Sequence, residues 1–264
     1  MRRVLVPTDF SPVSKNALLY GLELYKNSDT AFDIVHVYHP SFDPVQPEIL
    51  DSSLGLENVK RESMKSLIKS IQEKANQNKV ILNSKIEIGF TIEKIVELSQ
   101  DYDLIIMGST GSDSILNKIF GGISSDVAAK AECPVLLVPA KVKFTPLKKI
   151  IYSCDFDGVD ERILHKVVAF AKRYDASIRF VHIQNKDKEF VFTLSDNLDV
   201  NYSVSIVEAE SVREGISEYI KEENANLVIM ATKHRSFWEK IIHKSHTKEF
   251  ALTTDVPLLV YHEK

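Results

Sequence analysis

The sequence predicts an α/β protein made of two tandem domains, each an open parallel sheet of the Rossmann-like kind. Its 264 residues suffice for two domains of about 130 residues, each with its own core. Motifs near the start of the chain recur in its second half. Between these motifs, short runs of Val, Ile and Leu alternate with helical patterns, which is typical of βαβ units around a parallel sheet.

An internal repeat carries most of this prediction. The segment RRVLVPTDF at Arg2–Phe10 returns as KKIIYSCDF at Lys148–Phe156. At the same offset, FDIVHVY at Phe32–Tyr38 returns as IRFVHIQ at Ile178–Gln184. Because chance matches rarely keep one offset, we interpret the two halves of the chain as copies of one domain.

The later landmarks of the repeat indicate where the domains divide. DLIIMG at 103–108 matches NLVIMA at 226–231, now at a shorter offset. The second copy has therefore lost residues opposite the polar stretch 41–78, which predicts an extra loop and a longer helix in the first copy. We expect domains at residues 1–144 and 145–264.

The alternation places each element of the first domain. Strands are expected at 3–8, 32–38, 80–88, 103–108 and 135–139. The first helix begins at Ser11 and Pro12, because a serine oxygen can accept from a free backbone N–H and proline suits the first turn, and it runs to about Tyr25. Further helices are expected at 57–78 and 92–102, where apolar residues recur three and four positions apart.

Composition excludes several classes of protein. Hydrophobic residues make up 44% and charged residues 27% of the chain, with no run of 18 apolar residues to span a bilayer. The start lacks the apolar stretch of a signal peptide, so we expect a cytoplasmic protein. The formal net charge is −4 and neither half is basic, so we expect neither a nucleic-acid nor a membrane partner. Cys133 and Cys154 have no metal-ligand spacing and are interpreted as buried thiols.

Four of the chain's nine glycines cluster directly after the strand DLIIM: Gly108, Gly111, Gly121 and Gly122. Ligands of open parallel sheets bind beyond the carboxyl ends of the strands, and glycine lets backbone N–H groups approach a phosphate. The helix that follows, opened by Ser124, Ser125 and Asp126, has an N-terminal dipole that favours an anion. The segment therefore predicts a phosphate site. The alternative is that these glycines only form turns.

Better-known phosphate motifs are absent, because the chain contains neither G-x-x-x-x-G-K-[ST] nor G-x-G-x-x-G. GGISSD at Gly121 is similar to the SGG-x-DS loop of ATP pyrophosphatases. That loop should follow the first strand, where this chain has PTDFS instead. We therefore interpret the similarity as coincidental.

The glycine cluster resembles the G-x2-G-x9-G-[ST] motif that ATP-binding universal stress proteins carry after their fourth strand. Gly108, Gly111 and Gly121 fit its spacing, and VLVPTDFS, VHVY and CPVLLVP are similar to family landmarks in the same order. The resemblance covers nearly the whole chain. It implies a tandem UspA-like protein with the adenine-nucleotide alpha-hydrolase-like fold.

The resemblance also implies how the domains assemble. Single-domain members of the family dimerise through their last strand, which implies a pseudo-twofold pairing of 134–140 with 257–263 within this chain. An apolar edge strand would otherwise be prone to aggregation, which independently favours the pairing. A homodimer of the whole chain is a further form of assembly that the resemblance allows.

Twelve residues would bind the nucleotide if the family pattern holds, and the resemblance implies ATP or AMP, with or without Mg²⁺. The adenine end would be formed by Pro7, Thr8, Asp9 and Val37, the ribose would lie beside Met107 and Gly108, and the phosphates would be surrounded by Ser109, Gly111, Gly121, Gly122, Ile123 and Ser124. No catalytic residue and no metal ligand of the protein is implied.

One position departs from the family motif. The Ser or Thr expected after the third glycine is Gly122, so a hydroxyl for the phosphate is missing. Because a neutral hydrogen bond contributes about 0.5–1.5 kcal/mol, the loss should weaken binding several-fold. Ser124 is a candidate to compensate.

The second copy has lost the glycine motif. The positions aligned with its three glycines carry Ala231, His234 and Lys244. Phe237 and Trp238 add aromatic bulk to the same loop, although Asp155 keeps the place of Asp9. We therefore predict a single nucleotide site, in the first domain.

Regulation is favoured over catalysis. No Ser-His-Asp arrangement accompanies the glycines and only Lys118 lies near them, so any ATP hydrolysis should be slow and incidental. His36 and His182, which the repeat aligns, are interpreted as core or strand-end histidines. The leading hypothesis is a nucleotide-responsive regulatory or stress-response protein that an unidentified protein partner reads. The main alternative is a structural or interaction protein with vestigial sites in both domains, and a third is an ATP-dependent transferase on the same sheet.

Overall fold

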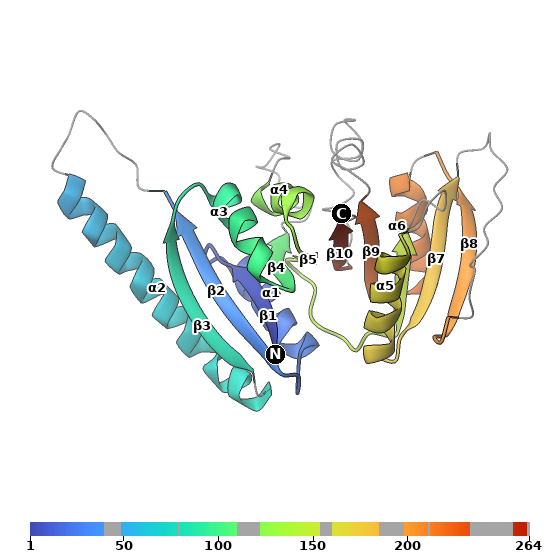
Figure 1. Ribbon diagram of the computed structural model, residues 1–264, viewed down its shortest axis with the longest axis horizontal. Helices are drawn as coiled ribbons and strands as arrows, with labels where there is room; N and C mark the ends of the chain where they lie inside the picture. The colour runs from blue at the N-terminus through green and yellow to red at the C-terminus, as the bar shows by residue number, and fades with distance from the viewer. Residues whose placement is uncertain are drawn as a thin grey trace. The chain divides into compact units, whose positions relative to one another are not determined.

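Figure 1 shows the computed structural model of the protein, which describes residues 1–39, 49–78, 80–109, 122–153, 160–184, 198–210, 212–232 and 256–262. Contacts divide the chain into two compact units, with the boundary between Phe144 and Thr145. We refer to the N-terminal part as unit 1 and to the C-terminal part as unit 2. Unit 1 runs from blue to green in Figure 1, and unit 2 runs from yellow to red.

Unit 1 is a parallel sheet with helices packed on it. Its strands are β1 (Arg2–Pro7), β2 (Thr30–Tyr38), β3 (Ile81–Ile88), β4 (Leu104–Ser109) and β5 (Val135–Pro139), in the spatial order β3-β2-β1-β4-β5. Every neighbouring pair is parallel. Its helices are α1 (Pro12–Leu24), α2 (Ile49–Asn78), α3 (Thr91–Leu98) and α4 (Ile123–Lys130). Helix α1 packs on α2, and α3 packs on α4. The two pairs cover the two faces of the sheet (Figure 1), so unit 1 is a doubly wound sheet.

Unit 2 repeats this strand order. Its strands are β6 (Lys149–Ser153), β7 (Ser177–Gln184), β8 (Tyr202–Glu208), β9 (Leu227–Thr232) and β10 (Leu258–His262), in the order β8-β7-β6-β9-β10 and all parallel. Helices α5 (Glu161–Arg173) and α6 (Val212–Glu223) follow β6 and β8. The predicted fold class, tandem Rossmann-like α/β sheets, is therefore confirmed. The pairing of the two last strands stays a prediction.

The first helix begins as predicted. Ser11 has extended backbone angles, and its hydroxyl oxygen accepts from the backbone N–H of Ser14 at 3.2 Å. Pro12 occupies the first turn, where it has no hydrogen bond to lose. The five strands of unit 1 also begin and end within two residues of the predicted bounds.

The predicted start of α2 is wrong. The helix begins at Ile49 rather than at Glu57. The serines and glycine in 51–55 are poor helix formers and favour a loop on local grounds. Extending an existing helix nevertheless adds one hydrogen bond per residue, and this outweighs weak propensities.

The end of α3 also differs from the predicted helix to Tyr102. The α-helix ends at Leu98, and a 3₁₀ turn follows at Ser99–Asp101. The Ser99 hydroxyl donates to the carbonyl of Val96 at 2.6 Å and accepts from a backbone N–H of the segment after α4 at 2.9 Å. These bonds give the chain an alternative to further α-helix.

The core of unit 1 is formed by its sheet and the inner faces of its helices. Val4, Leu5 and Val6 of β1 are fully buried, and Met64, Leu67 and Ile71 on the inner face of α2 are buried as well. Cys133 is a buried thiol, as predicted, whereas Cys154 lies outside the described residues. In the part of the chain that the structure describes, no helix is both long and apolar enough to cross a membrane.

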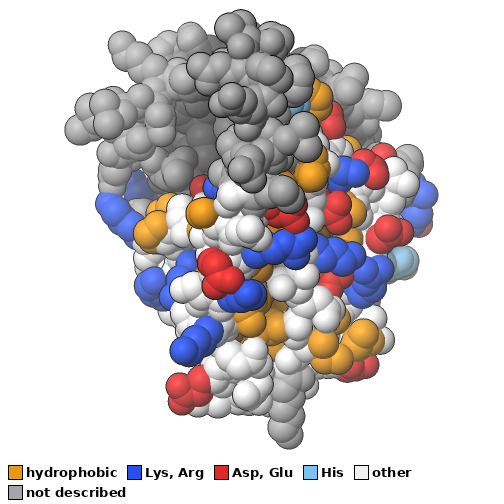
Figure 2. Space-filling model, turned by 90° about the vertical axis from the view of Figure 1, so that its left-hand side faces the viewer, with side chains coloured by type: hydrophobic (Ala, Val, Ile, Leu, Met, Phe, Trp, Pro, Cys, Tyr) orange, Lys and Arg blue, Asp and Glu red, His pale blue; other side chains and the backbone are white. Residues whose placement is uncertain are grey.

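The outer face of α2 carries mixed charge. Figure 2 shows Lys and Arg side chains interspersed with Asp and Glu over the face that lies at the left of Figure 1, where α2 and β3 run. Along α2, Arg61 pairs with Glu57, and Lys65 Nζ lies 2.7 Å from a carboxylate oxygen of Glu62. Such pairs contribute only about 0.2–0.5 kcal/mol each, so they mainly keep this face solvated.

A buried carboxylate ties together the amino-terminal half of the sheet in unit 1. Asp33 of β2 is 4% exposed and accepts three hydrogen bonds: from the Arg3 guanidinium at 3.0 Å, from the Tyr102 hydroxyl at 2.7 Å and from the Asn83 amide at 2.7 Å. Burial by itself raises the pKa of Asp33, but these three donors outweigh it and hold the pKa below its ordinary value. Asp33 is therefore an ionised, fully paired structural group.

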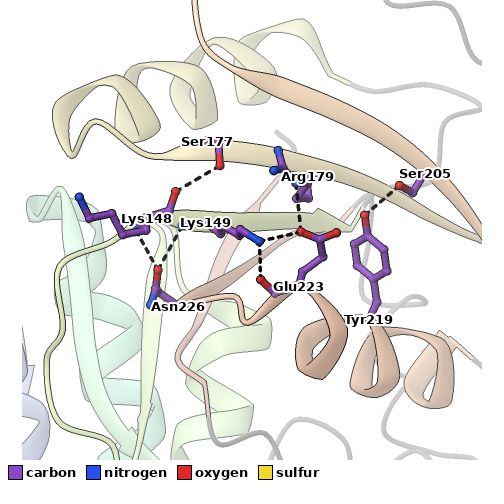
Figure 3. Close-up of polar contacts among 8 residues, drawn as sticks. All are labelled: Lys148, Lys149, Ser177, Arg179, Ser205, Tyr219, Glu223 and Asn226. Atoms are coloured by element: carbon purple, nitrogen blue, oxygen red, sulfur yellow. Dashed lines mark hydrogen bonds and ion pairs between the residues drawn. The ribbon is translucent and has the colours of Figure 1, made fainter.

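Unit 2 has a polar cluster at the corresponding place (Figure 3). Glu223, at the end of α6, accepts from Lys149 Nζ and from Arg179 Nε, both at 3.2 Å. The Asn226 side-chain oxygen accepts from the backbone N–H groups of Lys148 and Lys149, at 2.7 and 3.1 Å. The cluster thus joins the amino-terminal ends of β6, β7 and β9 to the end of α6.

Candidate functional site

Unit 1 contains a pocket of about 280 Å³ at the carboxyl ends of its strands. The strand order reverses around β1, whose neighbours are β2 on one side and β4 on the other. Open α/β sheets bind ligands at such a switch point. The lining comes from the ends of β1, β2 and β4 and from the starts of α1, α3 and α4.

Nine of the twelve residues predicted to bind a nucleotide line this pocket. They are Pro7, Thr8, Asp9, Val37, Met107, Gly108, Gly122, Ile123 and Ser124. Ser109 is absent from the lining described, because its side chain is buried at the end of β4. Gly111 and Gly121 lie outside the described residues.

The turn from β1 to α1 forms one wall of the pocket. Thr8 continues the β1–β2 ladder through its N–H to the carbonyl of Val35 at 2.8 Å, and its hydroxyl lies 3.0 Å from that of Ser14. Phe10 has a positive φ of 64°, a conformation that is uncommon for a bulky residue. The turn is therefore held by specific side-chain bonds and not by glycine.

Asp9 is the carboxylate of this wall. Its Oδ1 accepts from the backbone N–H of Ser11 at 3.0 Å. Burial raises the pKa of Asp9, but hydrogen bonds from Ser11 and Ser14 outweigh it, so the pKa lies below the ordinary value. Asp9 is consequently an ionised acceptor at neutral pH.

The two described glycines of the motif do different things. A Cβ on Gly108 would lie 2.7 Å from Val13 Cγ1 and 2.8 Å from the Val13 carbonyl oxygen, so glycine is required for α1 to pack on β4. A Cβ on Gly122 would meet no atom of the described residues within 4 Å. Gly108 thus serves helix–strand packing, whereas Gly122 leaves open space beside the pocket.

Gly122 is the N-cap of α4 and has no side chain to cap the helix. Its carbonyl accepts from Ser125 N at 2.9 Å and from Asp126 N at 3.2 Å. Ile123 and Ser124, in the first turn, line the pocket. Helix N-termini carry partial positive charge and N–H groups without intrahelical partners, so this wall suits an anionic group.

Seven lining residues were not predicted from the sequence: Ser11, Val13, Ser14, Val35, His36, Thr91 and Ile95. They come from the starts of α1 and α3 and from the strand end beside Val37. A signal was available for them, because each lies where the predicted topology brings a strand end or helix start to the carboxyl edge of the sheet.

His36 is the lining residue whose interpretation changes most. It is 7% exposed, as expected of a core histidine, yet it lines the pocket. Its Nδ1 lies 2.7 Å from the Thr8 carbonyl oxygen, and its ring lies 4.4 Å from the Phe10 ring between centroids. Burial lowers the pKa of His36, and the bond to Thr8 only partly opposes this. The ring is therefore neutral at pH 7.

The equivalent edge of unit 2 is described only in part. Ser153, the last residue of β6, and Ala231, the second-to-last residue of β9, align with Pro7 and Gly108 and are half-buried. The segments 154–159 and 233–255 lie outside the described residues, and with them Asp155, His234, Phe237, Trp238 and Lys244. The loss of the second site stays a prediction from the sequence.

Comparisons with known proteins agree with these features. The model of the universal stress protein family matches residues 1–139 and 193–262. Universal stress protein MJ0531 of Methanocaldococcus jannaschii is 28% identical over 139 residues, which are 52% of this chain and 81% of that protein. Universal stress protein Rv2624c of Mycobacterium tuberculosis is 27% identical over 145 residues, 54% of this chain and 50% of that protein.

A solved structure supports the fold along nearly the whole chain. The crystal structure of a universal stress protein from Archaeoglobus fulgidus aligns with 99% of this chain and 96% of its own, with a TM-score of 0.75. Sequence identity to it is 17%, so this likeness speaks for the fold alone.

Proposed function

Because the chain belongs to the universal stress protein family, we propose that the pocket of unit 1 binds an adenine nucleotide, ATP or AMP, and that its occupancy regulates a protein partner. The observation that carries the proposal is the gathering of nine of the predicted nucleotide-binding residues around one pocket at the switch point of the sheet. The pocket volume of about 280 Å³ lies just below the range of about 300–1,000 Å³ that is usual for small-molecule sites.

The walls of the pocket fit the two ends of a nucleotide. Val37 and Met107 offer apolar surface for a base, and Asp9 offers an ionised acceptor beside it. The space beside Gly122, where no described residue lies within 4 Å of a Cβ, and the first turn of α4 suit phosphates. A Mg²⁺ ion held by the phosphates would need few ligands from the protein.

We propose regulation and not catalysis as the activity of this site. A general base works best when its pKa lies near the operating pH, whereas the pKa of Asp9 is held below its ordinary value. Any hydrolysis of ATP is then slow and incidental. We place the protein in the cytoplasm, in keeping with its sequence.

Calorimetric unfolding of the full chain with and without ATP tests the proposal. ATP at about 100 times its dissociation constant should stabilise unit 1 by roughly 2.7 kcal/mol. Inorganic triphosphate at the same concentration is the control for a general anion effect. The alternative, a structural or interaction protein with vestigial sites, predicts no shift with ATP.

A further inference from the structure

Asp9 reaches the pocket from a turn whose backbone is strained. Phe10, the next residue, has a φ of 64°, which a bulky side chain rarely adopts and which persists only where surrounding contacts hold it. The Asp9 carboxylate accepts from the backbone N–H of Ser11, which belongs to the same turn. The position of Asp9 therefore depends on the contacts that fix the turn from outside.

His36 of β2 contacts both neighbours of Asp9. Its Nδ1 lies 2.7 Å from the Thr8 carbonyl oxygen and, because a carbonyl oxygen can only accept, Nδ1 carries the proton of this bond. Its ring lies 4.4 Å from the Phe10 ring between centroids. Since β2 pairs with β1 from its first residue to Val35, the imidazole holds the turn on both sides of Asp9 from a firm support.

This arrangement requires a neutral ring. With the proton on Nδ1, Nε2 carries a lone pair, and this atom is buried without a hydrogen-bond partner among the described residues. A second proton at Nε2 would bury a charged N–H that has no acceptor there, which is costly beside aromatic rings. The ring can therefore take up this proton only by leaving its place, and the contacts with Thr8 and Phe10 are then lost.

Charged groups near the ring act in opposite directions. Burial has the largest effect and lowers the pKa of His36, the bond to Thr8 and the charge of Asp9 oppose it, and the charge of Lys60 on α2 adds to it. Tyr38 of the same strand lies parallel to the ring at 6.3 Å. Because the pKa is lower in the folded chain, the contacts are complete above about pH 6.5 and are lost as the pH falls through the folded-state value.

We propose that His36 is a positioning residue: its neutral ring holds Thr8 and Phe10 so that Asp9 lines the pocket, and its protonation releases the turn and lowers the affinity for the nucleotide. This inference rests on the proposed function of the pocket. It requires no contact between His36 and the ligand, because the ring acts through the turn. Nucleotide binding should consequently weaken on mild acidification.

Two variants of nearly the same shape isolate the hydrogen bond to Thr8. In His36→Asn, the amide N–H₂ can take the place of Nδ1–H and donate to Thr8, and the side chain does not titrate. In His36→Leu, the donor is absent. Both variants lose the ring contact with Phe10, so the difference between them reports the bond that holds the turn.

Calorimetric titration of the full chain with ATP measures the effect on binding. At about pH 7.5, His36→Leu should bind roughly five- to tenfold more weakly than His36→Asn, because the Thr8 carbonyl has lost its donor. Between about pH 7.5 and 5.5, the wild type should lose roughly three- to tenfold more affinity than His36→Asn. Phosphates of the ligand titrate in the same range, but they contribute equally to both proteins and cancel in the comparison.

A control variant and a measurement without ligand accompany the titration. His39 lies 4.6 Å from the Phe90 ring between centroids, and His39→Asn should keep the pH dependence of the wild type. ¹⁵N NMR of the free wild type should show Nδ1 protonated and Nε2 unprotonated at about pH 7.5. On acidification, the backbone amide resonances of Phe10 and Ser11 should shift with the same midpoint as the His36 ring, and His36→Asn should lack this shift.

Equal pH dependence of ATP binding in the wild type and in folded His36→Asn would overturn the inference. So would amide resonances of Phe10 and Ser11 that do not follow the titration of His36, a result that needs no variant to fold. A wild-type chain that binds no ATP at any pH overturns the proposed function instead. The NMR titration then still decides whether His36 holds the turn.

Discussion

Unit 1 and unit 2 place opposite charges at equivalent points of two sheets that have the same strand order. The repeat aligns Asp33 of β2 with Arg179 of β7, and the adjacent basic residues Arg3 and Lys149 also align. In unit 1 the buried carboxylate is on the strand and its donors surround it. In unit 2 the strand carries the cation, and Glu223 of the following helix supplies the carboxylate (Figure 3).

What stays constant between the two units is a hydrogen bond from the backbone of the first strand to an aligned side chain. Arg3 N donates to the Asp103 side chain at 2.8 Å, and Lys149 N donates to the aligned Asn226 at 3.1 Å. The comparison teaches that the strand order tolerates a reversal of charge, provided that a neighbouring element supplies the partner. The sequences at the carboxyl edges of the two sheets differ, because only unit 1 keeps the glycines of the motif.

The largest effect is expected from Asp33→Ala. Removing this carboxylate leaves three donors without their acceptor in a buried place and should lower the free energy of unfolding by about 3 kcal/mol. The matched change in unit 2, Arg179→Ala, should cost only about 1 kcal/mol, because Glu223 is more exposed and keeps Lys149 as a partner. Chemical denaturation measures both losses.

Asp33→Asn separates charge from shape. Because the pKa of Asp33 is lower in the folded than in the unfolded chain, its contribution is present above about pH 4 and is lost as the pH falls through the folded-state value. The wild type should therefore lose stability on acidification more steeply than Asp33→Asn. Parallel pH profiles would contradict the ionised state assigned to Asp33.

Gly108→Ala tests the close approach of α1 to β4. The new Cβ would overlap the Val13 backbone, which cannot rotate away, so we expect a loss of about 1–3 kcal/mol in the unfolding of unit 1. Unit 2 already carries alanine at the aligned position, and Ala231→Gly should cost only about 0.5–1 kcal/mol through backbone entropy. A Gly108→Ala variant as stable as the wild type would show that the helix shifts freely.

Asp9→Ala and Asp155→Ala test the asymmetry of the two carboxyl edges. The first should weaken ATP binding by about tenfold or more, because it removes an ionised acceptor from the pocket wall. The second should leave ATP binding unchanged. Asp9→Asn, which keeps an acceptor for Ser11 N, controls for loss of the turn. Two equivalent sites per chain in a calorimetric titration would contradict a single-site protein.

The smallest effect is expected from Gly122→Ser. A side chain at this N-cap meets no atom of the described part of the chain, so the serine hydroxyl can reach a phosphate and should tighten ATP binding several-fold, up to about tenfold. Gly122→Ala adds the Cβ without the hydroxyl and should not tighten binding. Equal affinities of the two variants, measured by equilibrium dialysis, would argue against a phosphate beside Gly122.

Much of this protein was determined by its sequence alone. The repeat of Arg2–Phe10 and Phe32–Tyr38 predicted two sheets of one strand order, and the serine before Pro12 predicted where α1 begins. The resemblance to the universal stress proteins, which rests on the glycine spacing and the strand landmarks, implied nine residues of the pocket. These features are local, because apolar periodicity, capping and turn chemistry act over a few residues. They can be recognised in the sequence without knowledge of the fold.

Only the tertiary structure decided what each residue does in its place. Gly108 and Gly122 read alike in the sequence, yet one faces the Val13 backbone and the other faces open space. His36 read as a core histidine until the fold placed Thr8 at its Nδ1 and the pocket beside its ring. Asp33 read as one more strand residue until three distant donors met it. The physical reason is that packing, desolvation and hydrogen-bond satisfaction depend on contacts between residues far apart in the chain, which a local pattern does not contain.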